Sequence, residues 1–291
     1  SVNAVNTSND SISFAAVTLP AAPANLAGTS KVSTVTLNWD AVTSSASAPV
    51  SGYRIYQNVS GTPTLVGATS STTYDVTSLT NGTSYTFSVS AYGTAGEGLR
   101  SSSVSTTPYA LPAAVTIASP TLGDKSIDIS WTASPTTAAP ITGFDIYRDT
   151  TKVASNVSSS TTSYSFTGLT ANQSYTLKVV ALNIVGSTEA TATATAYTVP
   201  AQVANLAGTA GTSQVALTWN AVSSTSTAPV SGYRVYYKTS ADVTYTLLAA
   251  SASNSYTATG LTNGTDYNFQ VAAYGSAGEG LRSTSVTSRP L

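Results

Sequence analysis

One pattern recurs three times along this chain of 291 residues. Each copy has an alternating segment that ends in tryptophan, then a glycine followed by an aromatic residue, then a leucine that precedes a tyrosine by six residues. Because the copies follow one another at a period of about 90 residues, the sequence indicates an array of small domains rather than one large domain. The repeated tryptophans and closing tyrosines are Trp39, Trp131, Trp219, Tyr85, Tyr175 and Tyr267.

The repeats alternate between apolar and polar residues, which is typical of half-buried β-strands. In the first copy, Val35, Leu37 and Trp39 alternate with Thr36 and Asn38. No stretch has helical spacing over more than one turn, and the many threonines and valines favour strands. The sequence therefore predicts an all-β protein with about seven short strands per repeat, packed as two antiparallel sheets face to face.

The composition excludes most kinds of catalytic and charged binding site. With no histidine and no cysteine, the chain has no Ser-His-Asp or Cys-His nucleophile, no common zinc site and no disulfide. Charged residues make up 8% of the chain and the net charge is -1, whereas nucleic acids and anionic membranes require clustered Lys and Arg. We therefore predict a protein that is not an enzyme, uses no cofactor or metal, binds no nucleic acid and does not insert into a membrane.

These motifs together resemble the fibronectin type III module. The resemblance rests on Trp39, the segment Gly52-Tyr53-Arg54-Ile55-Tyr56, the pair Leu79 and Tyr85, and the turn Gly96-Glu97-Gly98, with matching residues in all three copies. It implies three consecutive immunoglobulin-like β-sandwiches. It also implies that the closing tyrosine of each copy forms a tyrosine corner, in which its hydroxyl bonds to the backbone.

We divide the chain at prolines that recur in apolar surroundings. The predicted modules are 20–111 (module 1), 112–199 (module 2) and 200–291 (module 3). Residues 1–19 resemble the closing hairpin of a truncated upstream module. Because the connections are short and contain proline, we expect limited hinge motion and a rod on the order of 100 Å.

An alternative assigns residues 1–19 to assembly. A lone hairpin exposes unpaired strand edges, so this segment would add to the sheet of another subunit and make the protein a filament subunit. Pairing of Ile12 and Phe14 with another chain would favour this hypothesis over the truncated module.

Alternation also predicts a shared outer face on the larger sheet. In the first repeat it holds Arg54, Tyr56 and Tyr92, while Glu97 and Arg100 in the nearby hairpin are weaker candidates. Such residues form either a contact surface or ordinary cross-strand packing. The corresponding set in the third repeat is Arg234, Tyr236, Tyr274, Glu279 and Arg282.

The middle repeat departs from this set, since Asp145 replaces the arginine and Leu182 replaces the second tyrosine. We expect any ligand binding there to be weaker. From the resemblance to modules of bacterial surface and secreted proteins, we expect a non-catalytic, extracellular spacer or adhesive segment. Its protein or glycan partner is not named by the sequence. The alternatives are the filament subunit, self-associating through residues 1–19, and a carbohydrate-binding accessory module that uses Tyr56 and Tyr236.

Overall fold

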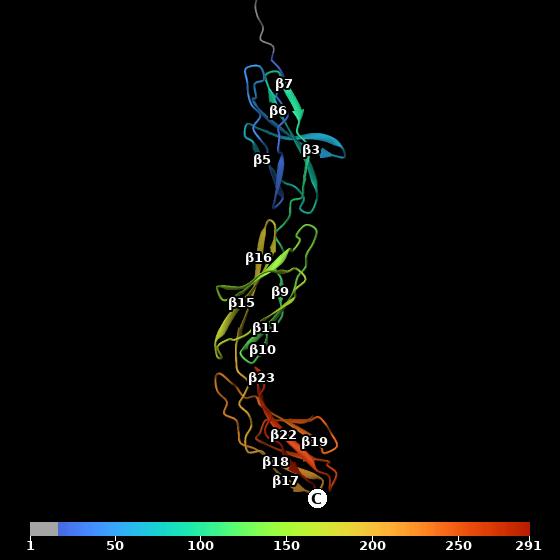
Figure 1. Ribbon diagram of the computed structural model, residues 1–291, viewed down its shortest axis with the longest axis vertical. Coiled ribbons are helices and arrows are strands. Elements are labelled where there is room, and N and C mark those ends of the chain that lie inside the picture. Colours follow the sequence, from blue (N-terminus) through green and yellow to red (C-terminus); the bar gives the residue numbers. More distant parts are fainter. Residues whose placement is uncertain (1–16) are drawn as a thin grey trace, which may run out of the picture. The chain divides into compact units, whose positions relative to one another are not determined.

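The computed structural model describes residues 17–291, and all regular structure in that range is β-strand (Figure 1). The strands fall into three consecutive groups, and each group forms two antiparallel sheets. The prediction of an all-β chain of three sandwiches is confirmed. Ile12, Phe14 and the other residues up to 16 lie outside the described range.

The strands of module 1 form a small sheet of three strands and a larger sheet of five. The small sheet has the order β1 (Ala27–Lys31), β2 (Thr34–Asn38), β5 (Thr73–Val76). The larger sheet has the order β4 (Thr62–Thr69), β3 (Gly52–Val59), β6 (Tyr85–Gly93), β7 (Gly96–Arg100), with β8 (Val104–Thr106) also paired to β6.

Module 3 repeats this topology. Its small sheet has the order β17 (Ala207–Gly211), β18 (Gln214–Thr218), β21 (Ser255–Thr259). Its larger sheet has the order β20 (Thr246–Ser251), β19 (Gly232–Thr239), β22 (Tyr267–Gly275), β23 (Gly278–Glu279), with β24 (Val286–Ser288) paired to β22. In modules 1 and 3 the last strand of the sandwich is therefore broken into two pieces.

Module 2 has the same two layers but breaks a different strand. Its first strand is split, because β9 (Thr116–Ile117) and β10 (Thr121–Gly123) both pair with β11 (Ser126–Thr132), which also pairs with β14 (Ser163–Phe166). The larger sheet has the order β13 (Thr151–Ser158), β12 (Gly143–Arg148), β15 (Ser174–Asn183), β16 (Gly186–Thr195). Its last strand, β16, is continuous over ten residues.

Each sandwich has its own apolar core around one indole ring. Trp39, Trp131 and Trp219 are 5%, 3% and 3% exposed. Each packs edge-on against the aromatic residue at the start of the next strand, with ring centroids 5.4 Å apart at Tyr53 in module 1 and Phe144 in module 2. All three indole nitrogens are buried without a hydrogen-bond partner in residues 17–291. Their burial shows that apolar packing, not hydrogen bonding, holds these rings.

The last hairpin of modules 1 and 3 requires glycine where the entering chain lies against it. A Cβ atom at Gly98 would clash with the carbonyl oxygen of Pro20, and one at Gly280 would clash with that of Pro200. The close approach lets the proline at the start of each module lie against the module's last hairpin. Modules 1 and 3 thus hold the segment of chain that enters them.

Candidate contact surface

In module 1, Glu97 is the centre of the predicted outer face. Its carboxylate accepts hydrogen bonds from Arg54 Nη1 at 2.6 Å, Tyr56 Oη at 2.6 Å and Ser90 Oγ at 2.5 Å. The structure thus joins Glu97, which the sequence suggested only as a separate hairpin candidate, to the residues of the sheet. Ser90 was missed, although its pairing opposite Arg54 in the β3–β6 register places it beside that arginine.

The tyrosine rings of this cluster are covered by arginine. The Arg54 guanidinium lies 5.0 Å from the centre of the Tyr92 ring, and that of Arg100 lies 4.1 Å from the centre of the Tyr56 ring. Tyr56 is only 8% exposed. These residues share the outer face, and the Tyr56 ring offers little open aromatic area because cation–π packing of Arg100 covers it, which favours the cross-strand packing alternative.

Glu97 is ionised down to strongly acidic pH. Burial by itself raises the pKa of a carboxyl group, but hydrogen bonds from Ser90, Tyr56 and Arg54, together with the Arg54 charge, outweigh it. The pKa of Glu97 is lowered to about 2. The same partnership raises the pKa of Arg54, so the ion pair persists across the physiological range.

Module 3 builds the same cluster around Glu279. Arg234 Nη1 and Tyr236 Oη donate to the Glu279 carboxylate at 3.0 and 2.7 Å. The Arg282 guanidinium lies 3.6 Å from the Tyr236 ring centre, and Arg234 lies 4.9 Å from that of Tyr274. Tyr236 is 7% exposed, so its ring likewise offers little open contact area. Burial and the bond to Glu279 raise the pKa of the Tyr236 hydroxyl.

Module 2 reverses the signs of the charges. Asp145, at the position of the arginine, is 7% exposed and accepts hydrogen bonds from the Lys152 ammonium and the Asn156 backbone N–H. Burial acts to raise the pKa of Asp145, but these bonds and the lysine charge lower it on balance. The ammonium groups of Lys152 and Lys178 lie 5.4 and 5.2 Å from the centre of the Tyr147 ring. All three modules thus neutralise their outer faces internally, with different residues.

The closing tyrosines all accept a hydrogen bond from the backbone five residues earlier. The distance from the donor nitrogen to the hydroxyl oxygen is 3.0 Å for Thr80 and Tyr85, and 3.0 Å for Thr170 and Tyr175. In module 3 the corresponding distance to Tyr267 is 3.1 Å. This geometry is that of a tyrosine corner, which fixes the crossover between the two sheets.

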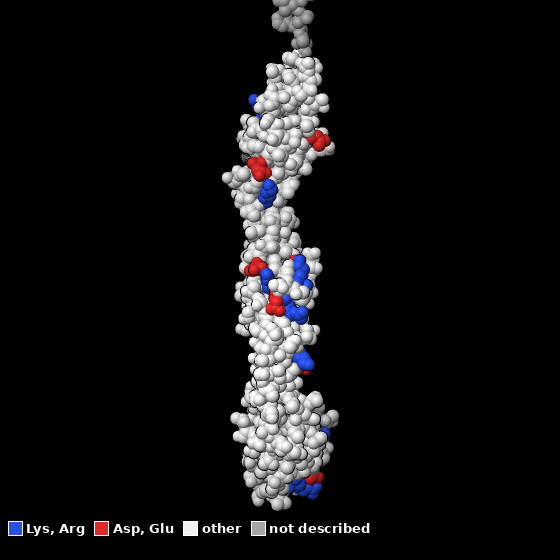
Figure 2. All heavy atoms as spheres, turned by 90° about the vertical axis from the view of Figure 1, so that its left-hand side faces the viewer, with Lys and Arg blue, Asp and Glu red and all other residues white. Residues whose placement is uncertain are grey.

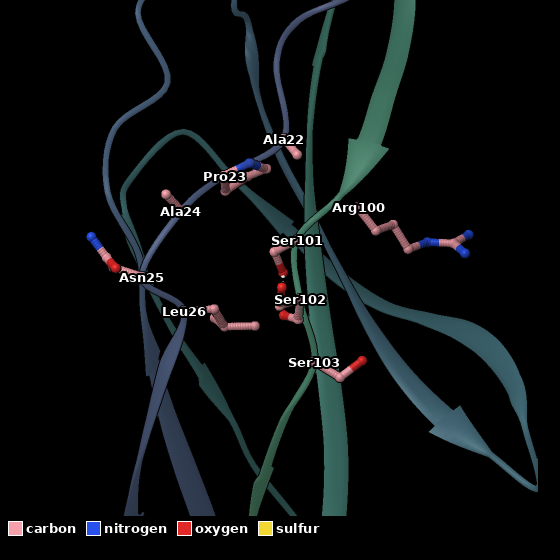
Figure 3. Close-up of a pocket in the computed structure, with 9 residues that line it drawn as sticks. All are labelled: Ala22, Pro23, Ala24, Asn25, Leu26, Arg100, Ser101, Ser102 and Ser103. Carbon is pink, nitrogen blue, oxygen red and sulfur yellow. Dashed lines mark hydrogen bonds between the residues drawn. The ribbon is translucent and has the colours of Figure 1, made fainter.

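The hollow drawn in Figure 3 offers little chemistry. It has a volume of about 490 Å³ and lies in module 1 between the segments 22–26 and 100–103. Alanine, proline and serine dominate its lining, and the side chain of Arg100 points away from it. In module 3 the Gln202 amide donates to the Arg282 carbonyl across the corresponding edge at 2.7 Å. In module 1 the position of Gln202 is taken by Ala22, which is too short to make this bond and leaves the hollow open.

Charge is sparse on the surface as well as in the sequence. Figure 2 shows a face that is mostly uncharged, with small groups of acidic and basic side chains. Within residues 17–291, no three Asp or Glu side chains gather as a metal site would require. The same range contains no helix that could span a membrane.

Fold and surface together define a tandem array of β-sandwich modules. The chain belongs to the fibronectin type III domain family, whose model matches residues 21–107, 112–197 and 201–289. Among solved structures, the FN1–FN3 domains of chicken CNTN1 align with 93% of this chain and 99% of that chain, at a TM-score of 0.51 and 19% identity. At that identity the likeness shows the fold alone.

The curated relatives include large bacterial enzymes. The chain is 33% identical to Exoglucanase B of Cellulomonas fimi over 90% of its own length and 24% of the relative's. It is 36% identical to Exoglucanase A of the same species over 89% of its length and 31% of the relative's. Chitinase A1 of Niallia circulans is 33% identical over 65% of this chain and 27% of the relative. The chain thus spans about a quarter to a third of each of these proteins.

Proposed function

We propose that this chain is a non-catalytic, extracellular spacer that holds other parts of a surface or secreted protein apart. The observation that carries the proposal is the way in which the two junctions are bonded. Similarity to segments of glucanases and a chitinase supports an extracellular setting, because glucans and chitin are polymers that such enzymes meet outside the cell.

At the first junction, adjacent residues are held by different modules. The Tyr109 N–H donates to the Lys31 carbonyl of module 1 at 3.3 Å, and the Ala110 N–H donates to the Ala138 carbonyl of module 2 at 2.7 Å. No unbound linker residue separates these two hydrogen bonds. A connection of this kind restricts hinge motion more than a free linker of several residues would.

At the second junction, adjacent residues are again bonded to different modules. The Tyr197 carbonyl accepts from the Lys125 N–H of module 2 at 2.7 Å, and the Thr198 N–H donates to the Thr227 carbonyl of module 3 at 2.8 Å. The Asp124 carboxylate also accepts from the Val199 N–H at 3.3 Å. Both junctions therefore have the same arrangement. This supports the spacer role, because joints with little hinge motion hold neighbouring modules at a fixed spacing.

The alternatives have less support. A carbohydrate-binding role needs aromatic faces that a sugar ring can stack upon, and arginine covers both Tyr56 and Tyr236. The filament hypothesis rests on residues 1–19, of which only the last three are described. There, Thr18 donates its N–H and hydroxyl to the Ser47 carbonyl of the same chain, at 2.6 and 3.1 Å.

Small-angle X-ray scattering tests the spacer. We expect the wild-type data to fit a narrow distribution of particle dimensions, and a flexible insertion of Gly-Ser-Gly-Ser between Tyr109 and Ala110 to broaden it. The matched control carries the same insertion between the exposed Ser159 and Ser160 of module 2, which should leave the distribution narrow. A wild-type distribution as broad as that of the junction variant would contradict the proposal.

A further inference from the structure

The continuous last strand of module 2, β16, lies at the edge of its sheet. In the larger sheet of this module the order of strands ends at β16, so within residues 17–291 one long side of β16 has no neighbouring strand in that sheet (Figure 1). Such an edge presents backbone N–H and C=O groups to any extended chain that approaches it.

Modules 1 and 3 protect the corresponding edge. In module 1, Ser101 donates its N–H to the Val89 carbonyl at 2.8 Å while its Oγ accepts from the Val89 N–H at 3.1 Å. In module 3, Ser283 makes the same two bonds with Val271, at 2.8 and 3.0 Å. Both serines lie in the gap between the two pieces of the last strand, where a side-chain oxygen takes the place of the backbone acceptor. Interrupting an edge is a common way to prevent strand addition.

Module 2 lacks this protection. The position of Ser101 and Ser283 is taken by Thr191, which is exposed on an unbroken strand. No proline occurs between Gly186 and Val199, whereas Pro108 and Pro290 follow closely on the last strands of modules 1 and 3. The middle module therefore presents a regular edge that its neighbours in the sequence do not.

The residues of this edge are complementary to a second copy of themselves. From Glu189 to Thr195 the strand alternates small alanines with polar residues, of which Glu189, Thr191 and Thr193 are exposed and Thr195 is half-buried. Antiparallel pairing centred on Ala192 puts Thr191 opposite Thr193 of the other copy, and cross-strand threonine pairs are favourable. Glu189, the only charged residue of the strand, then faces Thr195. Parallel pairing in register would instead place Glu189 against Glu189.

We propose that β16 is a self-association edge, through which two copies of this chain join their module 2 sheets in antiparallel fashion. The strand pair would extend over the seven residues from Glu189 to Thr195, or about 24 Å at the usual rise. With backbone hydrogen bonds and threonine pairs but no apolar core, the dimer is weak and forms at high local concentration. Association of this kind would bundle spacers that are crowded on a surface.

Sedimentation velocity of the full chain from micromolar to millimolar concentration tests the proposal. We expect a growing dimer fraction for wild type, and at least tenfold weaker association for T191K/T193K and for T191E/T193E, because like charges then face each other across the pair. Mixing the two variants in equal amounts should restore the dimer. Slower hydrogen exchange of the amides from 189 to 195 should accompany it.

The control variant is T257K/T259K, which places the same charges on two exposed threonines of the shorter edge strand β21. It should dimerise as wild type does, and circular dichroism should show that all variants keep their strands. A wild-type chain that stays monomeric at every concentration would overturn the proposal. So would undiminished dimerisation of T191K/T193K, or equal loss of association in the control.

Discussion

At the scale of the residue, Glu97 decides what the outer face of module 1 can do. Three donors converge on its carboxylate, and with the ion pair in place Arg54 and Arg100 lie over the rings of Tyr92 and Tyr56. The face is therefore occupied by its own side chains. Its residues link the sheet to the hairpin.

The variant Glu97→Gln should destabilise module 1 in a pH-dependent way. Because the folded pKa of about 2 lies below the usual value, the carboxylate stabilises the fold above about pH 4, and this stabilisation is lost as the pH falls towards 2. We expect a loss on the order of 2 kcal/mol at pH 7, allowing for partial exposure, and almost none at pH 2. Differential scanning calorimetry of the full chain measures this.

Glu189→Gln provides the matched control. Its carboxylate pairs with Lys178 at 2.9 Å, but its side chain is 59% exposed, so the change should alter stability by only a few tenths of a kcal/mol. Equal effects of the two substitutions, or an effect of Glu97→Gln that does not diminish in acid, would contradict the role given to Glu97.

At the scale of the element, the last strand of each sandwich separates two kinds of module. In modules 1 and 3 this strand is in two pieces, with an inward-bonding serine in the gap, whereas β16 runs on without interruption in module 2. The three modules share a core and differ at an edge. The proposed self-association of module 2 depends on this difference.

The variant Ser283→Ala should weaken module 3. Ser283 is 2% exposed, and its Oγ is the acceptor for the Val271 N–H at 3.0 Å. Without it a buried N–H loses its partner, so we expect a loss of about 1 to 3 kcal/mol in the free energy of unfolding, measured by urea denaturation. Ser285→Ala, at an exposed site in the same segment, should be nearly neutral. A neutral Ser283→Ala would show that the side-chain bond does not hold the break.

At the scale of the whole molecule, the chain lacks the two side chains whose ordinary pKa lies nearest to neutral pH. It contains no histidine and no cysteine, and its acidic and basic residues number 12 and 11. The lowered pKa values of Glu97 and Asp145 affect stability only in acid. The raised pKa values of Lys152 and Tyr236 contribute stability that is lost only as the pH rises through their alkaline range.

Stability of the full chain should therefore be nearly constant between about pH 5 and pH 9. We expect the melting temperatures of the three modules to vary by no more than about 2 °C over this range, and to be unaffected by reducing agents. Calorimetry in a series of buffers of equal ionic strength checks this. A transition centred near pH 6 or 7 would contradict it.

Much of the fold could be predicted because its signals are local. Alternation around Trp39 and the spacing of Leu79 and Tyr85 depend on neighbours in the sequence, and the structure has the all-β modules that they predict. The packing of an arginine over the Tyr56 ring could not be predicted from local sequence patterns. It depends on Arg100, which reaches the ring only because the last hairpin folds back along the sheet.

The order of residues by itself determined the number of modules, their two-layered fold and the absence of imidazole and thiol chemistry, since periodicity and composition need no coordinates. Only the tertiary structure decided that tyrosine faces are covered, that Ser90 joins Glu97, and that β16 forms an unbroken edge. The physical reason is distance along the chain. Side chains far apart in sequence interact only after the sheets have assembled.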